Sequence, residues 1–256
     1  MGKIPHDHDK KTTISKQRVE LIEELYQRYG KASGASIFSN RFRFYLKKYA
    51  WLFFIGTAKF LKRSLDILSS GTLILLLLPL FLVVAISIKI TDRGPVLFWQ
   101  KRVGKWGKEF QFPKFRSMVV NAEELKSSIM NQSHHEDSVT FKMKKDPRVT
   151  WIGRIIRKFS IDELPQLWNV FKGDMSLVGP RPPVPKEVDQ YSLSDRRRLD
   201  ITPGLTSIWA VSGRGDIPFD KQVELDVLYI ESQTIWTDIK ILIMTIPAVL
   251  FGKGAY

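Results

Sequence analysis

The chain has 256 residues, enough for one sizeable domain with extensions and a buried core. Its formal net charge of +14 leaves nucleic acid, an anionic membrane surface and phosphate-bearing substrates open as partners. There are no cysteines, which excludes disulfides and thiolate metal sites. The polar opening, residues 1–17, lacks the apolar core and cleavage site of a signal peptide, so we expect no export.

Residues 1–40 are expected to form a polar tail followed by an amphipathic helix. Apolar residues recur at helical spacing from Val19 to Tyr29, and Gly30 would end the helix. This helix would pack against the body of the protein or against a second subunit, so a homodimer stays open. The glycine and serine residues of 31–39 predict a linker.

Residues 41–92 are expected to form an interfacial and membrane segment. Aromatic and basic residues interleave from Arg41 to Arg63, a mixture that suits stacking on single-stranded nucleic acid or a helix in the lipid headgroup layer. The next stretch, Ile67 to Ile88, carries no charge and is about as long as a membrane-crossing helix. This run favours membrane lipid, and not nucleic acid, as the partner.

Three interpretations of the apolar run are open: a re-entrant helical hairpin, a straight span and a buried helix of a soluble core. Pro79 near its middle removes a backbone hydrogen bond and favours a bend. Both flanks are basic, with Lys59, Lys62 and Arg63 before the run and Lys89, Arg93, Lys101 and Arg102 after it. A straight span would put one cluster on the outer face, against the positive-inside tendency. We therefore place the re-entrant hairpin, bent at Pro79, slightly ahead of the span.

Residues 93–256 are expected to form the domain on the cytoplasmic face. The alternating stretches 96–100 and 109–112, joined across a glycine-containing turn, predict a β-hairpin. The hairpin leads to Lys114 and Arg116, which would project together, either as a solvated strand edge or as phosphate ligands. The predicted fold is mixed, predominantly α with a small β-hairpin, and membrane-associated through a re-entrant hairpin and interfacial amphipathic helices.

Two helix candidates and a polar loop follow the hairpin. The helix candidates are residues 121–131 and the basic amphipathic stretch 149–159. Between them, His134-His135-Glu136-Asp137 invites a zinc interpretation. Adjacent ligands without helical spacing or a second cluster are weak support for a metal site, so we favour a solvated loop.

The carboxyl-terminal part contains a charge run, two loops and an apolar stretch. Arg196-Arg197-Arg198 predicts a solvated or lipid-facing patch. Residues 202–206 and 211–215 predict loops that bring Arg214 close to a ligand. The apolar stretch 235–251 suits an interfacial amphipathic helix.

Two adjacent carboxylates, Asp162 and Glu163, follow a basic run. Ser160 to Glu163 matches a capping box with Ser160 as N-cap, so both acids could simply complement a helix dipole. A carboxylate can also attack phosphorus to give an acyl phosphate, and Glu163 could hold a Mg²⁺ ion that brings a diphosphate to Asp162. The phosphate charges would be balanced by Lys114, Arg116, Arg157 and Arg181, the last fixed by the rigid turn Gly179-Pro180-Arg181-Pro182.

These pieces occur in an order that resembles the bacterial sugar transferase family, the monotopic polyprenyl-phosphate phosphoglycosyl transferases. The resemblance covers about Lys62 to Tyr256. Besides the proline-broken apolar segment, the matching motifs are Lys114-Phe115-Arg116-Ser117-Met118, Asp146-Pro147-Arg148-Val149-Thr150, Ser160-Ile161-Asp162-Glu163-Leu164-Pro165-Gln166, Asn169-Val170, Gly173-Asp174-Met175-Ser176, Val178-Gly179-Pro180-Arg181-Pro182, Pro203-Gly204-Leu205-Thr206, Ser212-Gly213-Arg214 and Gly254-Ala255-Tyr256. Ser207 and Ala210 depart from the commoner Gly and Gln around Trp209.

The resemblance implies transfer of a sugar-1-phosphate from a UDP-sugar to undecaprenyl phosphate with release of UMP, the first membrane step of surface polysaccharide synthesis. It implies that Asp162 is the nucleophile, that Glu163 helps to hold Mg²⁺, and that Pro79 bends a segment entering from the cytoplasmic face of the inner membrane. The expected substrate contacts are Lys114, Arg116, Arg157, Pro180, Arg181, Pro182 and Arg214.

Two rival functions remain open beside the enzyme. A non-catalytic membrane scaffold that recruits other glycan enzymes would use the same basic and aromatic surfaces. It would release no UMP and would be indifferent to changes at Asp162. Nucleic-acid binding is suggested by charge alone, and the long apolar run argues against it.

Overall fold

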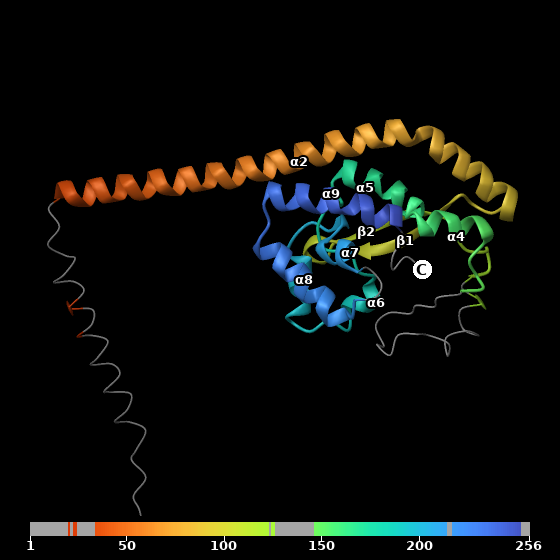
Figure 1. Cartoon of the computed structure of the whole chain (residues 1–256). Helices are drawn as coiled ribbons and strands as arrows, with labels where there is room; N and C mark the ends of the chain where they lie inside the picture. Colours follow the sequence, from red (N-terminus) through yellow and green to blue (C-terminus); the bar gives the residue numbers. More distant parts are fainter. Residues whose placement is uncertain are drawn as a thin grey trace, which may run out of the picture. The chain divides into compact units, whose positions relative to one another are not determined.

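The computed structural model describes residues 20, 23–24, 34–122, 124–125, 146–213 and 217–251 (Figure 1). Contacts divide the chain into two units, Met1–Thr57 and Ala58–Tyr256. Several predicted features lie outside the described residues: most of the helix over 19–29, most of the helix over 121–131, all of His134 to Asp137, and Arg214.

Helix α2, Gly34–Asp92, is the longest described element and contains both the aromatic–basic stretch and the apolar run. Helix α2 begins at Gly34, inside the stretch predicted as a linker. The linker prediction is therefore wrong for residues 34–39, because residues that extend a formed helix need no new nucleation. Of the described helices, only α2 is long and apolar enough to cross a membrane. Many of its apolar side chains are more than half exposed, namely Leu68, Leu75, Leu76, Leu78, Leu82, Val83, Ile86 and Ile90.

Pro79 lies inside α2, which continues on both sides of it. Proline has no N–H to donate to the carbonyl of Leu75, and such a gap favours a bend. Figure 1 shows α2 changing direction in its gold-coloured, carboxyl-terminal part. The predominantly helical, membrane-associated fold is confirmed at this level, and the re-entrant hairpin stays a prediction.

Two small sheets lie in the second unit. Strands β1, Leu97–Val103, and β2, Glu109–Phe115, pair antiparallel, which confirms the predicted β-hairpin. Their turn contains the 3₁₀ helix η1, Lys105–Gly107. Strands β3, Ser176–Val178, and β4, Gly204–Thr206, pair in parallel. The loop predicted over 202–206 is therefore wrong for β4, because three residues are too few to show a strand periodicity.

Short helices make up most of the rest of the second unit. They are α4 (Trp151–Lys158), η3 (Ile161–Gln166), α5 (Leu167–Lys172), α6 (Pro185–Val188), η4 (Asp195–Leu199), α7 (Ile208–Ser212), α8 (Phe219–Glu231) and α9 (Ile235–Phe251). The predicted helices over 149–159 and 235–251 are confirmed as α4 and α9. Val211 and Ser212 belong to α7, so the loop predicted over 211–215 is wrong at its beginning.

One member of the predicted arginine patch is buried. Arg198 is 5% exposed, and its Nη2 lies 2.7 Å from Asp226 Oδ2 of α8. Its Nη1 also donates to the hydroxyl of Tyr191 at 3.1 Å. The prediction of a solvated or lipid-facing patch is therefore wrong for Arg198, because its carboxylate partner comes from a distant helix.

Two apolar clusters form the core of the second unit. The first joins β2, α5, β3, α8 and α9 through Phe112, Leu167, Val170, Met175, Leu177, Val178, Tyr229 and Ile241. The second joins α2 to β2 and α4 through Val84, Ile88, Phe115, Ile152 and Ile156. The second cluster holds the end of α2 against the helix that precedes the two acids.

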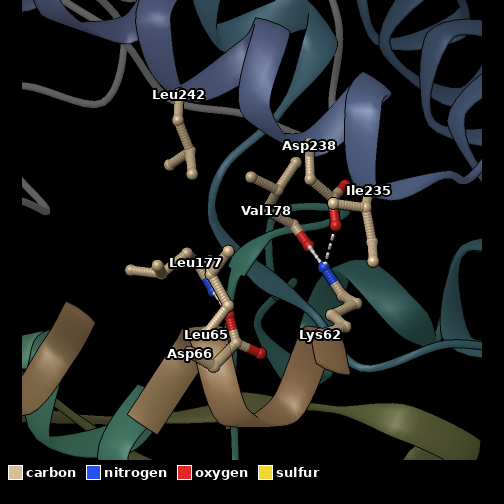
Figure 2. Close-up of a pocket in the computed structure, with 8 residues that line it drawn as sticks. All are labelled: Lys62, Leu65, Asp66, Leu177, Val178, Ile235, Asp238 and Leu242. Atoms are coloured by element: carbon tan, nitrogen blue, oxygen red, sulfur yellow. Dashed lines mark hydrogen bonds and ion pairs between the residues drawn. The ribbon is translucent and has the colours of Figure 1, made fainter. Parts of the chain in front are cut away.

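Two charged residues one turn apart on α2 hold strand β3 (Figure 2). Asp66 Oδ1 accepts hydrogen bonds from Leu177 N at 2.9 Å and from Ser176 Oγ at 3.1 Å. Lys62 Nζ donates to the carbonyl of Val178 at 3.2 Å and to Asp238 Oδ2 of α9 at 2.6 Å. Figure 2 shows both side chains pointing from α2 toward β3, with α9 on the far side.

A third residue of this turn holds α5. Arg63 donates to the carbonyls of Val170 and Phe171 at 2.6 and 2.7 Å, where the helix leaves its last carbonyls without backbone partners. Lys62 and Arg63, predicted as flanking cations for the membrane surface, are thus engaged with the protein. We define Lys62, Arg63 and Asp66 as the α2 anchor.

Replacing Asp66 by alanine should lower the free energy of unfolding by about 3 kcal/mol, because two buried donors would lose a charged acceptor. The donors are the Leu177 amide and the Ser176 hydroxyl. Denaturation of the purified protein in detergent micelles measures the change.

The matched control for Asp66→Ala is Glu224→Ala, which removes an exposed pair with Lys221. We expect it to cost less than about 1 kcal/mol. An equal loss of stability in the two variants would contradict the anchoring role of Asp66.

Candidate active site

Asp162 and Glu163 lie in the first turn of η3. Between α4 and η3, Ser160 adopts a left-handed conformation with φ of 54°. Its side chain makes no capping hydrogen bond to η3, so the predicted capping box is wrong. A capping side chain usually belongs to a residue in an extended conformation, and the left-handed turn at Ser160 removes that geometry.

Glu163 is the centre of an ionic cluster. Lys114 Nζ of β2 lies 2.7 Å from Glu163 Oε1. Arg181 Nη2, from the loop after β3, lies 3.2 Å from the same oxygen. The fold thus brings one of the two acids and two of the predicted cations together from three separate parts of the sequence.

The two neighbouring carboxylates differ in their electrostatics. Burial raises the pKa of Asp162 to about 6, although the charge of Lys114 opposes the rise. Burial also acts to raise the pKa of Glu163, but Lys114 and Arg181 outweigh it and hold that pKa well below its usual range. Glu163 is therefore a fixed anion, whereas Asp162 is a buried carboxyl that titrates near neutral pH.

The two cations respond in opposite ways. Glu163 raises the pKa of Arg181. Burial lowers the pKa of Lys114, while the Glu163 carboxylate acts against the fall. In the described part of the chain, no ion pair joins either cation to Asp162, so both are committed to Glu163.

The loop that carries Arg181 is held by backbone contacts on one side. Gly179 N donates to the carbonyl of Thr206 at 3.0 Å, and Gly204 N donates to that of Pro180 at 2.8 Å. A side chain at either glycine would overlap backbone atoms across this pair of strands. Glycine is required here because the two backbones approach each other so closely.

The remaining predicted site residues fall into two groups. Arg157 lies near enough to Asp162 to oppose the rise of its pKa, and Pro180 and Pro182 are buried on either side of Arg181. Arg116 packs its guanidinium against Gly94 instead of joining the Glu163 cluster, and its Nη1 is buried without a hydrogen-bond partner among the described residues.

Sequence reasoning missed a third cation beside the cluster. Arg102, predicted as part of the basic flank of the membrane segment, is only 9% exposed. Its Nη1 donates to the carbonyl of Pro182 at 3.0 Å. Burial, followed by repulsion from Arg181, lowers the pKa of Arg102 to about 10. No motif marks this residue, because the loop carbonyl that it binds lies 80 residues further along the chain.

The fold and the site define a membrane-associated protein in which paired carboxylates lie among cations. The family model described as bacterial sugar transferase matches residues 57–252. The chain belongs to the bacterial sugar transferase family.

Individual relatives support this membership. The chain is 46% identical over 245 residues to the galactosyl transferase CpsE of Streptococcus agalactiae, an alignment that covers 94% of this chain and 49% of the relative. It is 46% identical over 204 residues to the undecaprenyl-phosphate galactose phosphotransferase of Salmonella typhimurium, covering 78% and 42%. The chain thus spans about half the length of these two relatives.

A shorter relative matches over most of its own length. The exopolysaccharide production protein ExoY of Rhizobium meliloti is 38% identical over 198 residues, which cover 76% of this chain and 88% of the relative. The matched share of this chain agrees in extent with the family model, which begins at residue 57.

Asp162→Asn should stabilise the fold at pH 7.5 by up to about 3 kcal/mol, and Glu163→Gln should destabilise it by roughly 2 kcal/mol. A carboxyl whose pKa rises on folding, from 3.8 to about 6 here, contributes stability below pH 4 that is lost as the pH rises through 6. The gain from Asp162→Asn should therefore vanish near pH 4. The Glu163 pKa falls on folding, so its stabilisation is present above its unfolded pKa and is lost at lower pH.

Thermal unfolding in detergent between pH 4 and 8, with chelator and without substrate, measures both effects. The two variants differ by one position in the chain and serve as controls for each other. Changes of the same sign at pH 7.5 would contradict the opposed electrostatics of the two carboxylates.

Proposed function

We propose that this protein transfers a sugar-1-phosphate from a UDP-sugar to undecaprenyl phosphate and releases UMP, as the first membrane step of surface polysaccharide synthesis. The observation that carries the proposal is the pair of adjacent carboxylates, one locked by two cations and the other buried and titrating near pH 6. The names of the relatives, among them undecaprenyl-phosphate galactose and glucose phosphotransferases, support the substrate class.

In the proposed mechanism Asp162 is the nucleophile. Its carboxylate attacks the phosphorus that bears the sugar, a new acyl phosphate bond forms, and the bond to the UMP oxygen breaks. A phosphate oxygen of undecaprenyl phosphate then attacks the same phosphorus and releases Asp162 as a carboxylate. The raised pKa supports this role, because a more basic carboxylate is a stronger nucleophile while still largely ionised above pH 6.

The cations supply the electrostatic part of the mechanism. Lys114 and Arg181 form ion pairs with Glu163, next to the proposed nucleophile. They would also stabilise the negative charge of the entering phosphates. Arg157 lies close enough to affect Asp162 and would act in the same way. Arg116 and Arg214 remain proposed contacts for more distant parts of the substrate.

We propose Mg²⁺ as the cofactor, with Glu163 as the residue that would hold it. The donor set fits this ion, because Mg²⁺ binds through one or two carboxylates together with substrate phosphates. Among the described residues no group of three or more histidine, cysteine or acidic side chains comes together, so phosphate oxygens and water would complete the shell. The bound ion would neutralise the diphosphate and allow it to approach two anions.

The proposed location is the cytoplasmic face of the bacterial inner membrane. The exposed apolar side chains of α2 support insertion into lipid. Three other helices expose a tryptophan, Trp151 of α4, Trp168 of α5 and Trp236 of α9, which suits the headgroup layer. A re-entrant α2, bent at Pro79, would keep both ends on this face.

Replacing the proposed nucleophile, Asp162→Asn, should abolish UMP release and sugar-phosphate transfer, because the amide cannot form the acyl phosphate. The measurement uses membranes that contain undecaprenyl phosphate and a panel of radiolabelled UDP-sugars, with and without a chelator. Removal of the metal should also stop the reaction in the unmodified protein.

The matched control is Glu231→Gln, a carboxylate of α8 outside these motifs that pairs with exposed Arg197. We expect it to keep near-normal activity. Wild-type transfer by the Asp162→Asn variant would exclude the covalent role, and the absence of UMP release with every UDP-sugar would favour the membrane scaffold.

The topology of α2 can be tested by cysteine labelling, because the chain contains no cysteine of its own. Lys59 and Lys89 are exposed and lie on either side of the apolar run, and Leu78 lies next to Pro79. Lys59→Cys and Lys89→Cys should both react with an impermeant maleimide from the cytoplasmic side, and Leu78→Cys should stay unlabelled in intact bilayers. Labelling of Lys59→Cys and Lys89→Cys from opposite sides would establish a straight span.

A further inference from the structure

Arg102 is the last but one residue of β1 and lies behind the loop that carries Arg181. Its Nη1 donates to the carbonyl of Pro182, and its Nη2 donates to Gln100 Oε1 at 2.8 Å. The guanidinium carbon lies 5.1 Å from the centre of the Phe112 ring. The next residue, Val103, adds a backbone bond from its N–H to the carbonyl of Pro183 at 2.9 Å.

These contacts complete the support of the Arg181 loop. On one side the loop is held by β4 through Gly179 and Pro180. On the other side, the residue directly after Arg181 is held by the Arg102 side chain, and the following residue by the backbone of Val103. Arg102 therefore provides a side-chain hydrogen bond, from outside the loop, to the residue directly after Arg181.

The position is electrostatically unfavourable for an arginine. Arg102 is buried, and Arg181 is the charged neighbour with the largest effect on it, a repulsive one. Glu187, Glu163 and Tyr191 act in the opposite direction, each more weakly than Arg181. A buried cation next to another cation costs stability, and a purely structural filler for this space would not need charge.

We propose that Arg102 is a positioning residue, which holds the Arg181 loop through the Pro182 carbonyl so that the Arg181 guanidinium stays on Glu163 and in reach of the substrate phosphates. The inference rests on the proposed function for the identity of the phosphates. No hydrogen bond or ion pair joins Arg102 to Glu163 in the described structure, and only its charge acts on Glu163 directly. The proposed positioning effect passes through Arg181.

The test is a double-mutant cycle on UMP release in the full-length protein in membranes, using the UDP-sugar that the wild-type protein turns over. Arg102→Gln should lower kcat/KM about tenfold or more. The same change in an Arg181→Ala background should have almost no further effect, because a residue that acts through Arg181 has nothing left to position. Arg102→Lys, which keeps one donor for the Pro182 carbonyl, should recover activity to within about threefold of wild type.

Arg198→Gln is the matched control, since Arg198 is a similarly buried arginine whose guanidinium bonds Asp226 and Tyr191, and in the described structure it makes no hydrogen bond or ion pair to the Arg181 loop. Any loss that it causes should multiply with that of Arg181→Ala. A full tenfold loss from Arg102→Gln in the Arg181→Ala background would overturn the proposal, as would unchanged activity of Arg102→Gln. If Arg102→Gln does not fold, the cycle is run with Arg102→Lys, whose smaller loss should vanish in the same background.

Titration of UDP by calorimetry gives a second readout that does not need turnover. Arg102→Gln should weaken UDP binding several-fold in the wild-type background and leave it unchanged in the Arg181→Ala background. Absence of UMP release with all UDP-sugars would overturn the proposed function, and the UDP titration would still decide the role of Arg102. UDP affinity that Arg102→Gln leaves unchanged would overturn the positioning role.

Discussion

The site depends on how the α2 anchor fixes a strand of only three residues. A strand as short as β3 has little stability of its own, and Asp66 and Lys62 bond the Leu177 amide and the Val178 carbonyl of it. The strand leads directly into the loop that carries Arg181. Arg63 meanwhile holds the last carbonyls of α5, the helix that follows η3 and its two acids. The α2 anchor thus supports both β3, which leads to Arg181, and α5, which follows the two acids.

The cluster of Lys114, Arg181, Glu163 and Asp162 is not the arrangement that would make the fold most stable. Glu163 satisfies Lys114 and Arg181, which leaves Asp162 buried beside an anion with no ion pair to these two cations. Burial and a neighbouring anion both raise the pKa of a carboxyl, and Asp162 experiences both. Such a cost is typical of sites where a group must react instead of only stabilising the fold. The two acids, adjacent in sequence, therefore differ in their electrostatics.

Local patterns in the sequence predicted the hairpin of β1 and β2, the helices α4 and α9, and the acid pair in η3, because each depends on residues close together in the chain. The errors about charged residues concern contacts between distant segments. Lys62, Arg102 and Arg198 all looked like surface cations, yet each is bonded to groups 28 or more residues away. The capping box failed for a local reason, the left-handed conformation of Ser160. Buried charges cannot be distinguished from exposed ones by composition when their partners come from other elements.

The length of α2 relates the site to lipid. Thirteen residues separate Asp66, which holds β3, from Pro79, and at ~1.5 Å per residue this distance is about 20 Å. A hydrocarbon core of ~30 Å is thicker than that, so a helix that enters near Asp66 would reach its proline before it reached the far side. A bend at that depth would permit the second arm to return, and Val84 and Ile88 of that arm pack on Phe115 and Ile152 of the domain. The second arm therefore packs on the same domain that Asp66 holds. This packing is a physical reason to favour a re-entrant helix over a straight span.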